Sequence, residues 1–282
     1  MSGHHISVAV FWYGSLEALD LWYQKTLAAY SEIDLRSSRK YAEQVHNLFN
    51  IFVNTMGTLL VLDQHERLYA LLQSLGFTWD KDGFDCIDDW ATNHIAGLPP
   101  SALPAVNPID SYNASIRLLL FLSSPSGAID ESEVRAWIPS PQALAELHRD
   151  SHFSRMYGSY DIALFGPRAF LKLGRDDDAY ELCRLTVASD VTNRKTTLVS
   201  CYSILGEIAA KRGNFEDADG HIATALAEAK LSRLPMLELL AARDWKRHIL
   251  APQGRDASGA EVVIDGACAK MKKTREQLAS IL

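Results

Sequence analysis

Two histidines one helical turn apart are the residues in this sequence whose types and spacing first suggest chemistry. His148 and His152 lie four residues apart, and two imidazoles at that spacing on one helix can bind a transition metal. A zinc-protease motif would place glutamate directly after the first histidine, but that position is Arg149. The pattern is more typical of two exposed polar residues on a helix, so we expect no metal there.

An acidic stretch further upstream has part of the spacing of a calcium-binding loop. Asp80 and Asp82 would stand at positions three and five of the twelve-residue loop. In that register position one is Thr78 and position twelve is Asp89, where the loop has an acidic residue and a glutamate. The stretch therefore predicts an acidic surface turn rather than a calcium site.

The sequence lacks the motifs of several common enzyme classes. No GxGxxG, GxxxxGK or GxSxG occurs, so dinucleotide, P-loop and hydrolase-elbow chemistry have no sequence support. The four cysteines are far apart and form no CxxC pair, which indicates reduced thiols in the cytoplasm. We expect a protein that is not an enzyme and carries no cofactor.

Charge and hydropathy exclude two kinds of partner. The 28 Lys and Arg residues against 35 Asp and Glu give a net charge of −7, which would repel nucleic acid and anionic lipid. The most apolar stretch, residues 48–62, contains Asn50 and Asn54 and is shorter than the roughly 20 residues of a spanning helix. We expect a soluble cytoplasmic protein that binds neither nucleic acid nor membrane.

The spacing of apolar residues predicts helices along most of the chain. Between residues 16 and 30, apolar side chains recur at the interval of one helical face. Asp130, followed by Glu133, resembles a capping pair at the start of a later helix. Further helices are predicted at residues 39–62, 65–75 with Gly76 as its end, 113–122, 130–137 and 142–152.

Composition divides the chain into three segments. Residues 1–76 are predicted to form helical hairpins, which could be degenerate repeats. Residues 77–155 are rich in proline and other helix breakers, and they form either an irregular helical elbow or a set of degenerate hairpins. Residues 156–282 are regular, with repeats and a helix that caps the C-terminal end.

An internal repeat organises the last segment. A glycine recurs at spacings of 39 and 41 residues, and each time an alanine follows five or six residues later. Such self-similarity at a near-constant period is typical of stacked helical hairpins. The three pairs are Gly174 with Ala179, Gly213 with Ala218, and Gly254 with Ala260.

The middle repeat resembles the tetratricopeptide repeat family. Its first helix carries Tyr202, Leu205, Gly206 and Ala209, and its second helix carries Ala218, Ile222 and Ala225. Gly206 and Ala218 are small, so we predict a close approach of the two helices there. The period of 39 residues departs from the family's 34, and Pro167 in the preceding repeat predicts a kink in that repeat's first helix.

The resemblance implies an all-α fold, a tetratricopeptide-like solenoid of helical hairpins wound as a right-handed superhelix, with an irregular proline-rich middle. It also implies a non-catalytic scaffold that binds a protein or peptide partner in a concave groove. The alternative is a small-molecule-sensing or enzymatic all-α domain with the middle segment as a lid. In the family's register the groove would present Arg168, Lys172, Ser203, Glu207 and Lys211, and we expect the two lysine ammonium groups to stay solvated.

Overall fold

Every element in the described part of the chain is helical, and that part contains no strand. The computed structural model describes residues 10–15, parts of 17–28, and residues 55–80, 109–150, 162–189 and 195–282. The α-helices are α4 (His65–Ser74), α6 (Ile109–Ser123), α7 (Glu131–Trp137), α8 (Pro141–Asp150), α10 (Ile162–Lys172), α11 (Asp176–Val187), α12 (Lys195–Lys211), α13 (Phe215–Ser232), α14 (Pro235–Asp244) and α15 (Ser258–Met271). A π-helical turn η2 (Trp245–Leu250) continues α14, and the 3₁₀ turns are η3 (Ala251–Gln253) and η4 (Glu276–Leu278).

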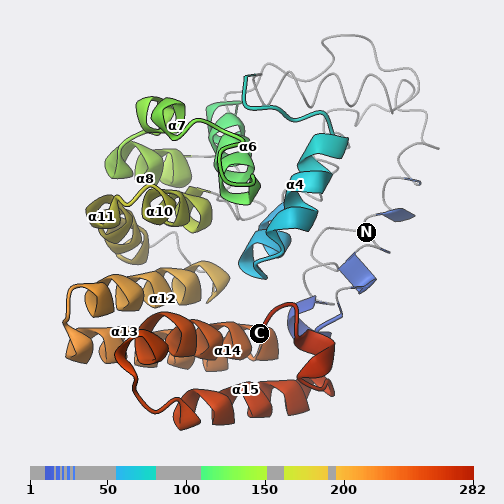
Figure 1. Cartoon of the computed structure of the whole chain (residues 1–282), viewed down its shortest axis with the longest axis vertical. Helices are drawn as coiled ribbons and strands as arrows, with labels where there is room; N and C mark the ends of the chain where they lie inside the picture. Colours follow the sequence, from blue (N-terminus) through green and yellow to red (C-terminus); the bar gives the residue numbers. More distant parts are fainter. Residues whose placement is uncertain are drawn as a thin grey trace.

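Three consecutive hairpins form the regular part of the fold (Figure 1). Helix α10 pairs with α11, α12 with α13, and the α14–η2 helix with α15. Gly174, Gly213 and Gly254 each follow the first helix of a pair with φ of +69°, +76° and +62°. Glycine adopts this left-handed conformation at little steric cost, so the predicted turn glycines are confirmed.

The crossing of α12 and α13 is as close as the repeat predicted. A Cβ atom on Gly206 would lie 3.2 Å from the carbonyl oxygen of Ala218 and 3.1 Å from Cδ1 of Ile249. Ala218 is fully buried, and Ile222 packs beside it. The small side chains therefore set the distance between the two helices.

Helix α10 continues through Pro167, where a kink was predicted. Proline has no N–H, so it cannot donate to the carbonyl of Ala163 four residues earlier. That carbonyl oxygen instead lies 3.8 Å from Sγ of Cys201 on α12, which acts as a weak donor. The neighbouring helix thus satisfies the acceptor that Pro167 leaves open.

The described helices of the middle segment pack onto the first hairpin. Helices α6 and α8 both contact α10, and α8 also contacts α11. The carboxylate of Asp130 accepts a hydrogen bond from the Ser132 N–H at 2.8 Å, which confirms the predicted N-cap of α7. In this part of the chain the segment extends the helical stack, whereas residues 81–108 and 151–161 lie outside the described residues.

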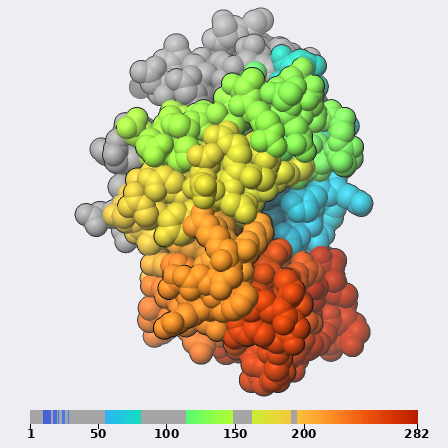
Figure 2. All heavy atoms as spheres, turned by 60° about the vertical axis from the view of Figure 1, so that its left-hand side comes forward, coloured from blue at the N-terminus to red at the C-terminus, as the bar shows by residue number. Residues whose placement is uncertain are grey.

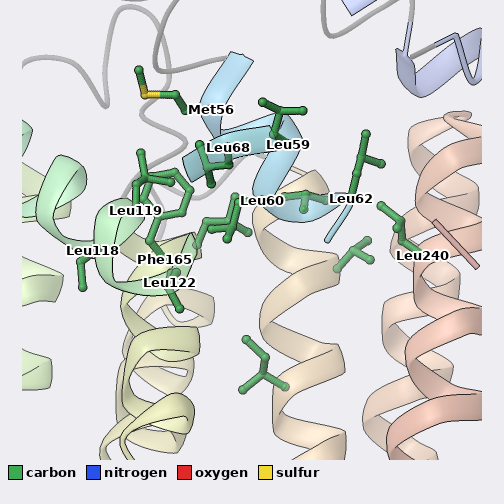
Figure 3. Close-up of a cluster of buried hydrophobic side chains, with 14 of the residues drawn as sticks. Met56, Leu59, Leu60, Leu62, Leu68, Leu118, Leu119, Leu122, Phe165 and Leu240 are labelled. Carbon is green, nitrogen blue, oxygen red and sulfur yellow. The ribbon is translucent and has the colours of Figure 1, made fainter. Parts of the chain in front are cut away.

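A segment from the N-terminal third covers the inner face of the first helices of the hairpins. Residues 55–61 are helical and turn at residues 62–64 into α4, which ends with Gly76 at φ +78° as predicted. Leu60 and Leu62 are fully buried and lie near Phe165 of α10 and Leu240 of α14 (Figure 3). Figure 2 shows the same segment set between the helices at either end of the stack. Chain segments far apart in sequence therefore share one core.

No helix in the part of the chain that the structure describes is long and apolar enough to cross a membrane.

The packing of the α12–α13 crossing predicts opposite effects for two substitutions on α13. Ala218→Leu should overpack the crossing and lower the free energy of unfolding by about 1–3 kcal/mol. Gly220→Ala, on the exposed face with no atom within 4 Å of the added Cβ, should raise it by about 0.5–1 kcal/mol. Urea unfolding of both variants measures these changes, and equal midpoints for Ala218→Leu and wild type would contradict the crossing.

Candidate functional site

A cleft of about 550 Å³ lies where the first helices of the three hairpins face the turn before α4. Four of the five groove residues predicted from the sequence line it, namely Arg168, Lys172, Ser203 and Glu207. Lys211 is not among its lining residues. The other lining residues are Leu60, Asp63, His65, Leu122, Leu171, Ile204, Arg243, Asp244, Arg247 and His248.

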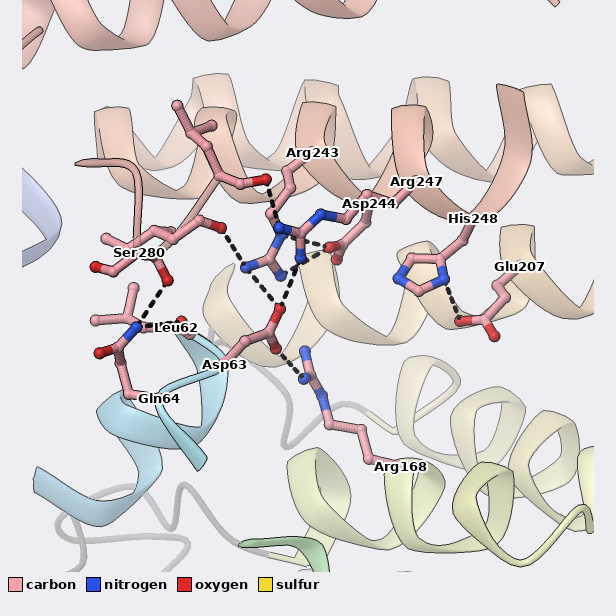
Figure 4. Close-up of polar contacts among 12 residues, drawn as sticks. Leu62, Asp63, Gln64, Arg168, Glu207, Arg243, Asp244, Arg247, His248 and Ser280 are labelled. Carbon is pink, nitrogen blue, oxygen red and sulfur yellow. Dashed lines mark hydrogen bonds and ion pairs between the residues drawn. The ribbon is translucent and has the colours of Figure 1, made fainter. Parts of the chain in front are cut away.

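The turn that carries Asp63 ends the helical segment 55–61 in a left-handed conformation. The N–H of Asp63 donates to the carbonyl of Leu60, and the N–H of Gln64 donates to that of Leu59, in the pattern of a Schellman motif. Asp63 has φ of +56°, a conformation that most residues avoid and that aspartate tolerates better than bulkier side chains. The turn points the Asp63 carboxylate at the hairpins (Figure 4).

Three arginines from two hairpins surround this carboxylate (Figure 4). Asp63 Oδ2 lies 2.9 Å from Nη1 of Arg243 and 3.3 Å from Nη1 of Arg247. Asp63 Oδ1 lies 3.6 Å from Nη1 of Arg168, which comes from α10 on the opposite side. The contact with Arg243 has the length of a charge-assisted hydrogen bond, and the one with Arg168 is too long for a hydrogen bond.

Arg243 is almost fully buried, with 2% of its surface exposed. Its Nε and Nη2 donate to Oδ1 of Asp244 at 3.0 and 2.8 Å, and its Nη1 donates to the carbonyl of Ile281 at 3.2 Å. Burial alone would raise the pKa of Asp244, but the charges of Arg243 and Arg168 and the Arg243 hydrogen bond outweigh it and lower the pKa. Burial alone would lower the pKa of Arg243, and Asp244 and Asp63 reverse that effect and raise it. Both groups therefore stay charged in the folded protein.

Three buried polar atoms around the cleft have no hydrogen-bond partner among the described residues. They are Nε of Arg168, Oγ of Ser203 and Nδ1 of His65. Burial lowers the pKa of His65, and the charges of Arg168 and Lys172 lower it further, against the opposing effect of Asp63. Buried polar groups in proteins are normally hydrogen-bonded. These three atoms therefore retain hydrogen-bonding capacity that the described chain does not use.

Lys172 lines the cleft, yet its ammonium group is engaged. Nζ donates to the carbonyl of Phe121 at 2.6 Å and lies 3.4 Å from that of Ser124, at the C-terminal end of α6. Burial lowers the pKa of Lys172. Lys172 is an exposed residue, in line with the expectation that its ammonium stays solvated, but carbonyls at the helix end, which attract a cation, also hold that ammonium.

Lys211 is also paired rather than free. Its Nζ lies 2.9 Å from Glu207 Oε1 and 3.7 Å from Asp176 Oδ1. Burial would lower the pKa of Lys211, but the hydrogen bond and charge of Glu207, with the charge of Asp176, raise it. The prediction that Lys211 faces the same groove as the other four residues has no support in the lining of the cleft.

The cleft brings together a serine, a histidine and a glutamate, the side-chain types of a hydrolytic triad. Oε2 of Glu207 lies 3.8 Å from Nδ1 of His248, which is longer than a hydrogen bond. Oγ of Ser203 has no hydrogen-bond partner among the described residues, so none of them is placed as a base to take its proton. In the described residues these three side chains are therefore not joined by the hydrogen bonds of such a triad.

The metal-site alternatives concern residues that the structure describes only in part. The side chain of His148, all of His152 and the stretch from Asp82 to Asp89 lie outside the described residues. Among the described residues, no group of three or more histidine, cysteine or acidic side chains is placed to hold a metal.

Sequence reasoning missed part of the site. Arg168 and Glu207 each stand six residues before a repeat glycine, and the same count before Gly254 gives His248. Applying the same six-residue offset to the weak third repeat would have predicted His248 as a residue of the cleft. Asp63 had no comparable signal, because it reaches the cleft through a contact with Arg247 that spans 184 residues of chain.

Comparison with known proteins gives limited information. No family model matches the chain, and no solved structure does. A curated relative is the nonribosomal peptide synthetase easA of Emericella nidulans, which is 26% identical over 216 residues. The match covers 73% of this chain and 3% of the synthetase, so the chain spans a small fraction of the relative it matches.

The buried ion cluster predicts a large effect for one arginine and a small one for another. Arg243→Met should lower the free energy of unfolding by about 3–5 kcal/mol, because it leaves the largely buried Asp244 without its partner. Arg184→Met removes an exposed arginine paired with Glu181 at 2.9 Å and should cost less than about 1 kcal/mol. Chemical denaturation of both variants measures the difference, and similar losses would show that burial of the cluster does not matter.

The lowered pKa of Asp244 predicts how stability depends on pH. Because its pKa in the folded protein lies below the usual 3.8, its contribution is complete above about pH 4 and is lost as the pH falls through the folded value. The stability difference between wild type and Asp244→Asn should therefore be constant between about pH 5 and 7 and shrink below about pH 4. Urea titrations across this range measure it, and a difference that grows on acidification would contradict the assignment.

Proposed function

We propose that this chain is a non-catalytic module of tetratricopeptide-like hairpins that binds a protein partner through its inner-face cleft. The observation that carries the proposal is the lining of the cleft, to which all three first helices contribute. Successive helical repeats that expose equivalent positions along one face form the binding surfaces of repeat proteins. That the hairpins wind into a superhelix is part of the same proposal.

The size of the cleft limits what it can receive. A volume of about 550 Å³ holds a few side chains, and the segment around residues 55–65 bounds it on one side. We therefore infer that the partner inserts a short stretch of chain rather than a long helix. Arg247, whose side chain is 42% exposed, stands where that stretch would meet the cleft.

The alternative is a small-molecule-sensing domain with the middle segment as a lid. Leu122, a residue of the described middle segment, lines the cleft. Helices α6 and α8 of that segment pack against α10. Such packing favours a fixed wall over a lid that opens. Ser203 has no hydrogen-bond partner among the described residues and the histidine–glutamate contact is long, and both observations likewise favour binding over catalysis.

The similarity to a synthetase supports the proposal only in outline. The match occupies 3% of that protein, so its peptide-synthesising activity does not follow for this chain. A similar segment that forms a small part of a much longer protein is compatible with a module that works by contact with other protein segments.

Peptide selection with two charge-reversed variants tests the proposal. Peptides from a random displayed library are selected on the wild-type protein, and their affinities are measured by fluorescence anisotropy. Arg247→Glu should weaken binding by more than about fivefold, the effect of losing an interface residue worth over 1 kcal/mol.

Arg255→Glu is the matched control, because Arg255 also contacts a carboxylate, that of Asp219 at 2.7 Å, but does not line the cleft. It should bind the selected peptides like wild type. Melting temperatures confirm that both variants are folded. Equal affinities for Arg247→Glu and Arg255→Glu would place the partner site elsewhere on the molecule.

A further inference from the structure

Asp63 has an unusual location for a negative charge. It lies two residues after the helical segment 55–61, and the carbonyl groups at the end of a helix repel anions. The other non-glycine residues at positive φ in the described chain are Arg233 and Lys272, cations that suit the end of a helix. The arginines of the cleft, and not the turn itself, therefore account for an aspartate at this position.

The three arginines are unequally satisfied by this one carboxylate. The guanidinium group of Arg243 has Asp63, Asp244 and a backbone carbonyl as close partners. Arg168 is largely buried, with 19% of its side chain exposed, yet its contact with Asp63 is 3.6 Å long. The Nε of Arg168 has no hydrogen-bond partner among the described residues, although Nε together with one Nη is an edge that binds a carboxylate in a bidentate manner.

We propose that the cleft recognises an acidic side chain of the partner and that Asp63 partly occupies the place of that carboxylate in the free protein. This inference rests on the proposed function and names the chemistry of its partner. The incoming carboxylate binds Arg168 and Arg247, while Asp63 keeps its contact with Arg243. Oγ of Ser203, which is 95% buried in the same lining, supplies a donor with no other partner among the described residues.

The charge around the cleft selects a carboxylate over a phosphate. Three arginines, Arg168, Arg243 and Arg247, face two carboxylates, Asp63 and Asp244. The third carboxylate of the lining, Glu207, is already paired with Lys211 at 2.9 Å, and the ammonium of Lys172 is held by carbonyls at the end of α6. The balance among these arginines and aspartates is a single positive charge, which suits one monoanion better than a dianion. A short segment with a glutamate or aspartate residue is therefore the occupant that fits.

Binding of labelled peptides tests the role of Asp63. A fluorescein-labelled hexaglutamate peptide should bind the wild-type chain, and Asp63→Asn should bind it about tenfold more tightly, the size expected for one charged hydrogen bond. Arg168→Gln should bind it at least about tenfold more weakly than wild type. A hexaglutamine peptide of the same length should show no gain with Asp63→Asn.

Two further variants separate the site from general effects. Asp219→Asn removes a carboxylate paired with an arginine outside the cleft, so it changes the net charge equally and should leave the affinity for hexaglutamate unchanged. Asp63→Gly removes the same carboxylate as Asp63→Asn but suits the left-handed turn, so it gives a second folded variant. Circular dichroism melts confirm folding of each variant.

The possible results distinguish this inference from the proposed function. Equal gains for Asp63→Asn and Asp219→Asn, or tighter binding of a phosphoserine peptide than of hexaglutamate, would overturn the inference. Failure of hexaglutamate to bind wild type or Asp63→Asn, while selected peptides remain sensitive to Arg247→Glu, would overturn it and leave the proposed function intact. A specific gain with Asp63→Asn, alongside selected peptides that ignore Arg247→Glu, would support the carboxylate site and contradict the wider proposal.

Discussion

The buried contact between Asp63, Arg243 and Asp244 is the interaction on which the cleft depends. Transfer of a guanidinium from water into the protein interior costs several kcal/mol unless charges and hydrogen bonds compensate it. Arg243 has two carboxylates and the carbonyl of Ile281 around it, and one of these carboxylates comes from the N-terminal third of the chain. The ion cluster therefore fixes the turn at residues 62–64 against the third hairpin. Gln64 reinforces this contact by donating to the carbonyl of Ser280 at 2.8 Å.

The repeat explains why the wall of the cleft is charged. The position six residues before each repeat glycine faces inward, and it is Arg168, Glu207 and His248 in turn. A stack of helices that only had to pack would fill inward positions with apolar or small side chains, as happens at the crossing of α12 and α13. Here the inner face combines both types, because the leucines of segment 55–62 cover part of it and the polar cleft occupies the rest.

The sequence was sufficient for features that depend on neighbouring residues. The turn glycines, the N-cap at Asp130 and the close approach at Gly206 each need information from a few positions or from one repeat. The role of Lys172 could not be predicted in this way, because the carbonyls it binds belong to a helix about 50 residues earlier. Asp63 was missed for the same reason. Four of the five residues predicted for a groove nevertheless line the same cleft, since the register of a repeat carries long-range information that single motifs lack.

Two rules of local structure are broken at the cleft. An aspartate occupies a left-handed turn where the other described left-handed turns use glycine or a cation, and buried polar atoms of Arg168 and Ser203 lack partners among the described residues. Each departure costs free energy, of order 1–3 kcal/mol for a strained backbone or an unsatisfied buried group. Departures of this kind in natural proteins concentrate at functional sites. In the proposed complex a carboxylate that reaches Arg168 relieves this cost, so part of the binding free energy is already stored in the free protein, in buried polar atoms that the described chain leaves unpaired.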